Sequence, residues 1–178
     1  EDRCYHCKRA LYLELAAIAA DEGGAVVVDG SNTDDERDIR PGRRALQELG
    51  ITTPLADLGF GKELIRQMAR ARGLPNWAAP ACACLASRIP YGEEITAFRL
   101  HRIGGAEEEI RALGFTNFRV RDHGLVARIE VPAEEISRAL SVETRRGLVD
   151  ACRRYGFSYV ALDLEGYRTG SLNEVVSP

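Results

Sequence analysis

Two cysteines separated by a single residue, Cys82 and Cys84, carry the clearest potential for chemistry in this sequence. They lie in a stretch bounded by Pro80 and Pro90, which disfavour a helix, and the alternating alanines give little bulk for a core. We therefore expect a loop, and loops carry function more often than packing. A thiolate can act as a nucleophile or bind a metal. The alternative is that both cysteines are small buried hydrophobic residues.

A second pair, Cys4 and Cys7, has the two-residue gap found in many zinc and redox sites. Together with Cys82 and Cys84 it would supply four thiolates, enough for a tetrahedral zinc ion or an iron–sulfur cluster. The alternative is two cysteines at the start of a helix. The chain has 5 cysteines, an odd number that argues against a disulfide framework and favours reduced thiols.

Arginines gather on one face of an expected hairpin. Because successive side chains of a strand point to opposite faces, Arg119 and Arg121 share one face of the first strand. Arg128 and Glu130 share a face of the second strand. Arginine is the preferred partner of phosphate and carboxylate, so this face is a candidate anion site. The alternative is a solvent face in which Glu130 balances part of the charge.

A polar loop follows the apolar run at residues 25–28, which we expect to be a fully buried strand. Ligands of open α/β sheets bind at the carboxyl ends of the strands. We expect this loop to offer close backbone approach, hydrogen bonds to a nucleotide and carboxylates for Mg²⁺. The residues concerned are Gly30, Ser31, Asn32, Asp34 and Asp35. The alternative is a solvated turn made of turn-forming residues.

The elements that position these residues fall into two groups. In the first group helices are expected at 8–20, 43–49 and 62–72, with strands at 25–28 and within 51–58. This alternation predicts a parallel sheet covered by helices, an α/β arrangement.

The pattern changes after Gly92, which places a domain boundary near residue 95. The second group begins with a helix at 96–113 capped by Thr96 and a hairpin of strands 115–121 and 125–131 joined by residues 122–124. Helices at 133–140 and 143–155 and a strand at 157–164 follow. The sequence thus predicts two domains, 1–95 and a smaller α+β domain at 96–178.

Composition limits the classes of function. The 178 residues are 45% hydrophobic with a formal net charge of -3, which predicts a globular protein with one substantial core or two small ones. No apolar stretch approaches the roughly 20 residues of a membrane span, and no leader is visible, so we expect a cytoplasmic location. The negative charge argues against a nucleic-acid partner. The sequence opens without a methionine, and we expect a fragment of a longer protein.

Several motifs, in this order and spacing, resemble the LarE family of the PP-loop ATP pyrophosphatase superfamily. They cover nearly the whole chain and are Arg3–Lys8, Asp29–Asp35, Arg40–Gly42, Cys84–Gly92, Arg119–Arg121 and Leu164–Arg168. The resemblance implies that residues 1–95 are the C-terminal part of a parallel-sheet PP-loop domain. The Ser-Gly-Gly-x-Asp-Ser loop that grips the ATP pyrophosphate in this family is absent from the 178 residues. The resemblance implies that it precedes Glu1, so that the fragment alone is not a competent ATPase.

The family resemblance implies an adenylating sulfur transferase. AMP from MgATP activates a carboxylate of pyridinium biscarboxylic acid mononucleotide, and sulfur then replaces the adenylate, in biosynthesis of the nickel-pincer cofactor of lactate racemase. In one branch of the family a protein cysteine gives up its sulfur; in another, cysteines hold a [4Fe-4S] cluster that carries an extra sulfide. The Cys82/Cys84 pair favours a cluster or a persulfide. The resemblance also implies a homo-oligomer with a small nucleotide-like substrate.

The resemblance assigns roles to the candidate residues. Cys84 or Cys82 would deliver the sulfur, with Cys4 and Cys7 as further candidate cluster ligands. The nucleotide phosphate or the leaving adenylate would be bound by Ser87, Arg88, Arg119, Arg121 and Arg168. Two other classes compete with this one: a zinc- or cluster-stabilised interaction module, and a tRNA-thiolating PP-loop enzyme, which the negative net charge counts against.

Overall fold

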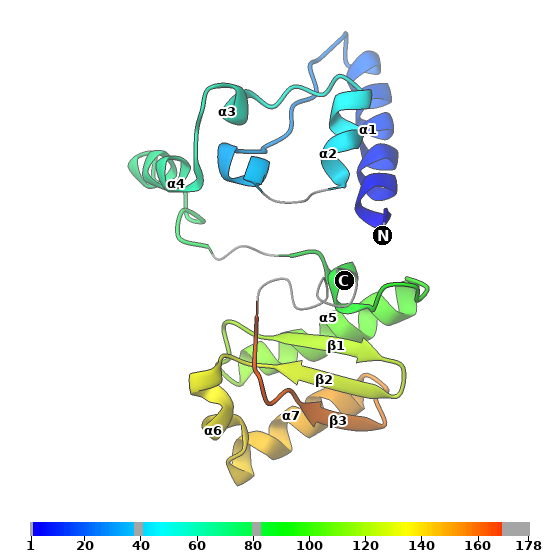
Figure 1. The fold of residues 1–178 in the computed structure, drawn as a ribbon, viewed down its shortest axis with the longest axis vertical. Coiled ribbons are helices and arrows are strands. Elements are labelled where there is room, and N and C mark those ends of the chain that lie inside the picture. The colour runs from blue at the N-terminus through cyan, green and yellow to red at the C-terminus, as the bar shows by residue number, and fades with distance from the viewer. Residues whose placement is uncertain (1, 38–40, 80–82, 169–178) are drawn as a thin grey trace. The chain divides into compact units, whose positions relative to one another are not determined.

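A computed structural model describes residues 2–37, 41–79 and 83–168 of the chain, which divides into two compact units, Glu1–Ala81 and Cys82–Pro178 (Figure 1). The division falls before the Cys84 loop, earlier than the boundary expected near residue 95. The loop belongs to the second unit because Ile89 is fully buried in that unit's core and Leu85 packs against it.

The first unit is mainly helical in the described residues. Its elements are α1 (Arg3–Asp21), the 3₁₀ helix η1 (Thr33–Arg37), α2 (Gly42–Glu48), α3 (Pro54–Asp57) and α4 (Lys62–Ala71). The three helices predicted from the sequence are confirmed, with α1 beginning earlier than expected. Helices α1 and α2 pack closely because Gly42 has no side chain: a Cβ there would lie 2.9 Å from Cδ of Lys8.

The prediction of a buried strand at residues 25–28 is wrong for the described structure. Val28 forms only an isolated parallel bridge with Thr52, and Val26 and Val28 are 77% and 55% exposed. An apolar strand becomes buried when neighbouring strands and covering helices flank it on both sides. The described residues give this segment one bridge partner, so the expected helix-covered parallel sheet is not formed among them.

The second unit contains a small mixed sheet with helices on one face (Figure 1). The strands β1 (Arg119–His123), β2 (Val126–Glu130) and β3 (Tyr159–Leu162) lie in the order β1-β2-β3, with β1 and β2 antiparallel and β2 and β3 parallel. The helical elements are η2 (Leu85–Arg88), α5 (Ala97–Ala112), η3 (Ala133–Glu135), α6 (Ile136–Ala139) and α7 (Val142–Arg154). The chain is therefore an α/β protein, and the predicted hairpin, helices and last strand are confirmed with shifted ends.

The core of the second unit lies between the sheet and helices α5 and α7. Val120 and Ile129 are cross-strand partners, and both are buried on the helix-facing side. Arg119 and Arg121 therefore lie on the opposite side of the sheet, as the alternation in the sequence predicts. The predicted cap of α5 is also confirmed, because Oγ1 of Thr96 accepts a hydrogen bond from the Arg99 amide at 3.2 Å.

The turn expected at residues 122–124 begins later than predicted: Asp122 and His123 belong to β1, and Asp122 is fully buried. Its carboxylate accepts hydrogen bonds from Nε of Arg102 at 2.7 Å, Nη2 of Arg99 at 3.0 Å and the Gly124 amide at 3.0 Å. Burial alone would raise the pKa of Asp122, but the hydrogen bonds from Arg102 and Arg99 hold it below its usual value. These contacts fasten the hairpin to α5.

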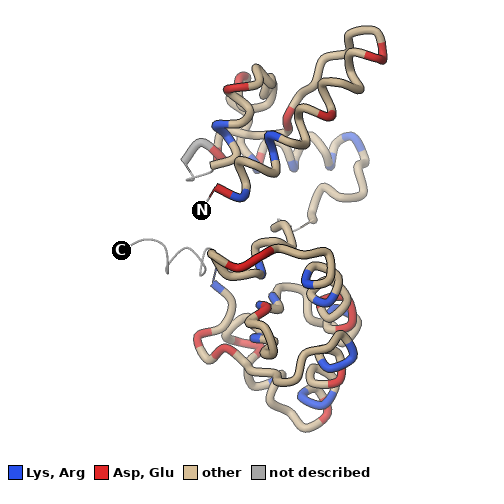
Figure 2. Tube along the Cα trace, turned by 90° about the vertical axis from the view of Figure 1, so that its right-hand side faces the viewer, with Lys and Arg blue, Asp and Glu red and all other residues tan. Residues whose placement is uncertain are grey.

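Charged residues of both signs are interspersed along the described chain (Figure 2). Within residues 2–37, 41–79 and 83–168, no helix combines the length and the apolar character that a membrane crossing requires.

Candidate functional site

The Cys84 thiol lies at the surface of the second unit, immediately before η2. Its carbonyl oxygen accepts hydrogen bonds from the amide of Ser87 at 2.9 Å, from Oγ of Ser87 at 2.7 Å and from Nη1 of Arg88 at 3.1 Å. Ile89, which follows the turn, is fully buried. The backbone of the turn is therefore fixed while the thiol remains exposed.

Arg88 is a buried residue that connects the cysteine turn to α5. Its guanidinium contacts both carboxylate oxygens of Glu107, with Nε–Oε1 at 2.9 Å and Nη2–Oε2 at 3.0 Å. The remaining Nη1 donates to the carbonyl of Ala83 at 2.9 Å as well as to that of Cys84. Oε1 of Glu107 also accepts the Val120 amide of β1 at 3.1 Å. One carboxylate thus joins the turn, the helix and the sheet edge.

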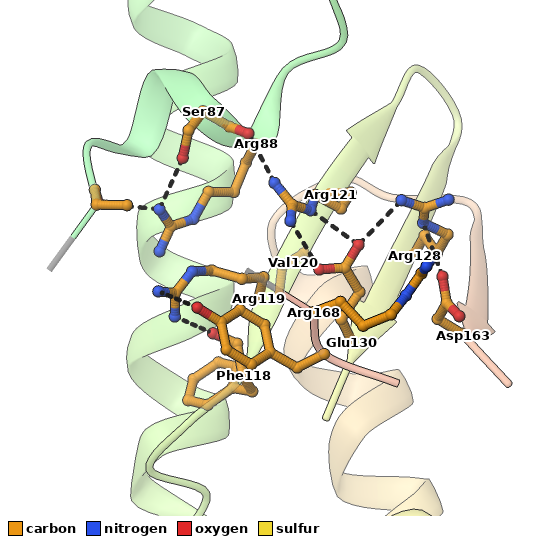
Figure 3. Close-up of polar contacts among 12 residues, drawn as sticks. Ser87, Arg88, Phe118, Arg119, Val120, Arg121, Arg128, Glu130, Asp163 and Arg168 are labelled. Atoms are coloured by element: carbon orange, nitrogen blue, oxygen red, sulfur yellow. Dashed lines mark hydrogen bonds and ion pairs between the residues drawn. The ribbon is translucent and has the colours of Figure 1, made fainter. Parts of the chain in front are cut away.

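Arg121 repeats this arrangement from β1. It contacts both oxygens of Glu130 at 2.9 and 2.8 Å, and its Nη1 donates to the carbonyl of Ser87 at 2.7 Å (Figure 3). Glu130 is 1% exposed and also accepts from Nη2 of Arg128 at 2.9 Å. Arg128 additionally lies 3.5 Å from Asp163. The positive charge of Arg121 is therefore balanced by the buried carboxylate of Glu130.

Arg119 has a different environment. Its guanidinium donates to the carbonyl of Phe118 at 2.6 Å and to the hydroxyl of Tyr167 at 3.3 Å, and lies 4.8 Å from the centre of the Tyr167 ring. Within the described part of the chain it has no carboxylate partner. Of the candidate anion-binding arginines, Arg119 is held by neutral groups, so its charge is available to a ligand. Arg168 is exposed and pairs with Glu165 at 2.6 Å.

Tyr167 reaches this position because of the glycine before it. Gly166 has a φ of +76°, and a Cβ there would lie 2.7 Å from the Val131 carbonyl oxygen. The Tyr167 amide donates to that same oxygen at 2.8 Å. Only glycine permits such a close approach at a positive φ. The sequence reasoning singled out the segment 164–168 but not this role for Tyr167; Gly166 was the available signal.

The predicted nucleotide loop lies in the first unit. Oδ1 of Asp29 accepts the Ser31 amide at 2.8 Å and also the Ser31 hydroxyl, while Oδ2 accepts from the Tyr12 hydroxyl and from Nζ of Lys8 at 3.2 Å. Burial alone would raise the pKa of Asp29, but the hydrogen bonds from Ser31, Tyr12 and Lys8 lower it to about 2. The sequence analysis did not assign a role to Asp29 or Tyr12.

Asn32, Asp34 and Asp35 are engaged within the loop. Oδ2 of Asp35 accepts from Nδ2 of Asn32 at 2.8 Å, and Oδ2 of Asp34 accepts the Lys62 amide at the start of α4 at 2.7 Å. Both carboxylates therefore hold the loop in shape. A Cβ on Gly30 would meet nothing within 4 Å, so the backbone there is open to approach. Ser31, Asn32 and Asp35 line a polar pocket of about 210 Å³ in this unit.

The thiols do not form a metal site in the described residues. Among residues 2–37, 41–79 and 83–168, no group of three or more His, Cys, Asp or Glu side chains is placed to hold a metal ion. Cys4 and Cys7 are exposed on α1 in the first unit, Cys84 is in the second unit, and Cys82 lies outside the described residues. Cys152 is buried, and burial followed by the charge of Glu109 raises its pKa to about 12, which suits packing rather than nucleophilic chemistry.

The second unit thus brings together Cys84, Ser87, Arg88 and Arg121, with Arg119 on the same sheet face as Arg121. The nucleotide-loop residues and the Cys4/Cys7 pair belong to the first unit. Glu107, which sequence reasoning missed, is the residue that braces Arg88. No motif marks it, because a buried glutamate in an amphipathic helix looks like a solvent-facing one.

The chain is similar to known proteins along nearly its whole length. A scan against protein-family models gives no match. The chain is 46% identical over 177 residues to an uncharacterised protein, slr1717, of Synechocystis, and covers 66% of that protein. It is 38% identical over 176 residues to pyridinium-3,5-bisthiocarboxylic acid mononucleotide synthase of Lactiplantibacillus plantarum, covering 63%. It is 33% identical over 168 residues to an uncharacterised protein, MJ0830, of Methanocaldococcus jannaschii, covering 65%.

Fold and site together define an α/β protein that presents a cysteine beside an arginine-lined sheet face. The alignment with the Lactiplantibacillus synthase includes 99% of the chain, which confirms the resemblance predicted from the sequence. The chain belongs to the LarE family. It spans slightly less than two thirds of the length of these curated relatives.

Proposed function

We propose that the protein to which this chain belongs is an ATP-dependent sulfur transferase of nickel-pincer cofactor biosynthesis. Its substrate would be pyridinium biscarboxylic acid mononucleotide, of which one carboxylate becomes a thiocarboxylate. The printed name of the Lactiplantibacillus relative, a bisthiocarboxylic acid mononucleotide synthase, supports this choice. The observation that carries the proposal is the exposed Cys84 thiol on a turn that two buried arginines hold at the sheet edge.

The proposed reaction has two stages. The substrate carboxylate attacks the α-phosphorus of ATP, the acyl-adenylate forms and pyrophosphate leaves. The Cys84 thiolate then attacks the acyl carbon, AMP leaves and a thioester remains. Loss of the Cys84 Cα proton and cleavage of its Cβ–S bond release the thiocarboxylate and leave dehydroalanine. Each protein molecule would transfer the sulfur of one cysteine.

The arginines would have two different tasks in this reaction. Arg119 would bind the phosphate of the mononucleotide or the adenylate, because its guanidinium is held by neutral groups among the described residues and gains most from an anion. Arg168, which is exposed and pairs with Glu165, would bind the same anion from the surface. Ser87, Arg88 and Arg121 would act on the same ligands through the cysteine turn that they fix, because both guanidiniums are already paired with buried carboxylates. Gly30, Ser31 and Asn32 would contact the nucleotide, with Asp34 or Asp35 placing Mg²⁺.

A [4Fe-4S] cluster is the alternative source of sulfur that the family resemblance implies. Among the described residues, no three His, Cys, Asp or Glu side chains are placed to hold it. A cluster would need Cys82 or cysteines of both units, and it would supply a sulfide in place of the Cys84 sulfur. We also propose a cytoplasmic homo-oligomer, an assembly that light scattering can test.

The test uses full-length protein incubated with ATP, Mg²⁺ and the pyridinium substrate. Pyrophosphate and thiocarboxylate are quantified, and the protein mass is measured by mass spectrometry. Conversion of Cys84 to dehydroalanine supports the sacrificial route. An intact protein that turns over repeatedly and is brown when prepared anaerobically supports a cluster. The proposal is wrong if Cys82→Ser and Cys84→Ser each retain full transfer. One equivalent of zinc, with melting on chelation, would instead indicate a structural module.

A further inference from the structure

The carboxylate of Glu107 occupies a central position in the second unit without facing solvent. It is 4% exposed and accepts three hydrogen bonds, two from Arg88 and one from the Val120 amide. A buried carboxylate is costly unless all its contacts are satisfied, so this geometry restrains each partner strongly. The partners belong to segments that carry the candidate chemistry: the cysteine turn and strand β1.

The contact continues from Arg88 to the cysteine itself. With Nε and Nη2 occupied by Glu107, Nη1 points at the carbonyls of Ala83 and Cys84, at 2.9 and 3.1 Å. The planar guanidinium cannot rotate to follow the turn without leaving Glu107. Glu107 on α5 therefore fixes the position of the Cys84 backbone through the planar guanidinium of Arg88.

The same carboxylate fixes the neighbouring anion-binding residue. Val120 follows Arg119 in β1, and its amide is held by Oε1 of Glu107 at 3.1 Å. The Glu107 oxygen that orients Arg88 therefore also fixes β1 at Val120, next to the residue from which the Arg119 side chain projects. The positions of the sulfur donor Cys84 and the anion-binding residue Arg119 therefore both depend on Glu107.

We propose that Glu107 is a positioning residue for sulfur transfer, which sets the distance between the Cys84 sulfur and a substrate anchored at Arg119. This inference rests on the proposed function in that sulfur transfer is the step affected. Displacing reacting groups by about 1 Å can cost on the order of a hundredfold in rate. Adenylation does not use the cysteine, and a glutamine oxygen at position 107 can still accept the Val120 amide that places Arg119, so adenylation should not depend on the charge of Glu107.

The test compares full-length Glu107→Gln with Glu109→Gln, a matched control on the same helix. Glu109 pairs with the exposed Arg154 and does not contact the turn. The glutamine in Glu107→Gln keeps one acceptor but turns a donor toward the Arg88 guanidinium. We expect single-turnover sulfur transfer to fall about ten- to a hundredfold, with pyrophosphate release unchanged. Equal losses in both steps, or no loss in transfer, would overturn the inference.

Hydrogen exchange gives a readout that does not require the proposed function. The amides of Ser87 and Ile89 are bonded within the turn, to Cys84 and Ala86. We expect these amides to exchange at least about tenfold faster in Glu107→Gln and unchanged in Glu109→Gln. Unchanged exchange in both variants would contradict the inference. A wild-type protein that makes no thiocarboxylate would refute the proposed function and leave the exchange result intact.

A second variant covers the case in which Glu107→Gln does not fold. In Arg88→Lys the ammonium keeps the charge next to Glu107 but cannot also reach the carbonyls of Ala83 and Cys84. We expect the same selective loss of transfer and the same faster exchange in residues 84–89. If Arg88→Lys transfers sulfur at the wild-type rate, Glu107 does not position the cysteine through Arg88.

Discussion

Glu130 separates two arginines that face each other across the hairpin. Arg121 and Arg128 are direct cross-strand partners, and Oε1 of Glu130 lies 2.9 Å from Nε of the former and 2.9 Å from Nη2 of the latter. Like charges directly opposite each other destabilise a strand pair. A single buried carboxylate therefore makes this arginine-rich face compatible with a folded sheet.

Removal of that carboxylate should be costly. We expect Glu130→Gln to lower the free energy of unfolding by about 3–5 kcal/mol, because it leaves Arg121 buried without its charge partner. Urea denaturation followed by circular dichroism measures the change. The control is Glu165→Gln, which breaks the exposed pair with Arg168 and should cost about 0–1 kcal/mol. Equal effects in the two variants would show that the pair with Arg121 is not a significant source of stability.

The arginine-rich face of the hairpin was predicted from the sequence only in part. Alternation along the strands predicted that Arg119 and Arg121 share a face, since a strand has a fixed period of two. It did not predict that Glu130 and Glu107 would bind Arg121 and Arg88 in two-point contacts. Those contacts depend on the distance between the hairpin, η2 and α5, and this distance is a property of tertiary packing.

The apolar run at residues 25–28 illustrates the opposite error. Its composition predicts burial, yet Val26 and Val28 are largely exposed in the described structure. An apolar composition shows that a segment would be stable if buried, but burial also requires strands and helices that pack against it. The sequence also suggested that the Asp29–Asp35 loop binds a ligand. It did not predict the hydrogen bonds within the loop, such as that from the Ser31 amide to Asp29, because these depend on the three-dimensional structure.

The Asp29 network should make stability depend on pH in acid. Its pKa in the folded protein is about 2, below the ordinary value of 3.8, so ionised Asp29 stabilises the fold above pH 3.8. This contribution should be lost as the pH falls from 3.8 towards 2. We expect Asp29→Asn to be less stable than wild type at neutral pH, with the difference shrinking across that interval in urea titrations.

A control for this pH effect is Asp21→Asn, at the exposed end of α1. Because this side chain is exposed, the substitution should change the free energy of unfolding at neutral pH by no more than about 0.5 kcal/mol. If the stability difference between Asp29→Asn and wild type did not change between pH 3.8 and 2, the bonds from Ser31, Tyr12 and Lys8 would not be lowering the pKa of Asp29 in solution.

Thiol reactivity should separate the cysteines of the second unit. Cys84 is exposed, whereas Cys152 is fully buried and its pKa is raised to about 12. We expect iodoacetamide at about pH 8 to alkylate Cys84 in the native protein and to spare Cys152, because the thiolate is the reactive form. Peptide mass spectrometry reads both sites, and labelling of Cys152 after denaturation is the positive control. Native labelling of Cys152 at the rate of Cys84 would contradict the packing described here.

The neutral partner of Arg119 should decide how strongly this face binds an anion. The Tyr167 hydroxyl and ring hold the guanidinium without cancelling its charge. We expect Tyr167→Glu to weaken binding of the substrate mononucleotide by about tenfold or more, because an internal carboxylate would compete for Arg119. Tyr167→Phe keeps the ring and loses one long hydrogen bond, so binding should weaken by less than about fivefold. Titration calorimetry measures both affinities, and the Tyr167 amide bond to Val131 is available to either variant because it involves only backbone. If Tyr167→Glu binds the mononucleotide as tightly as wild type, then the charge of Arg119 is not what the substrate anion meets.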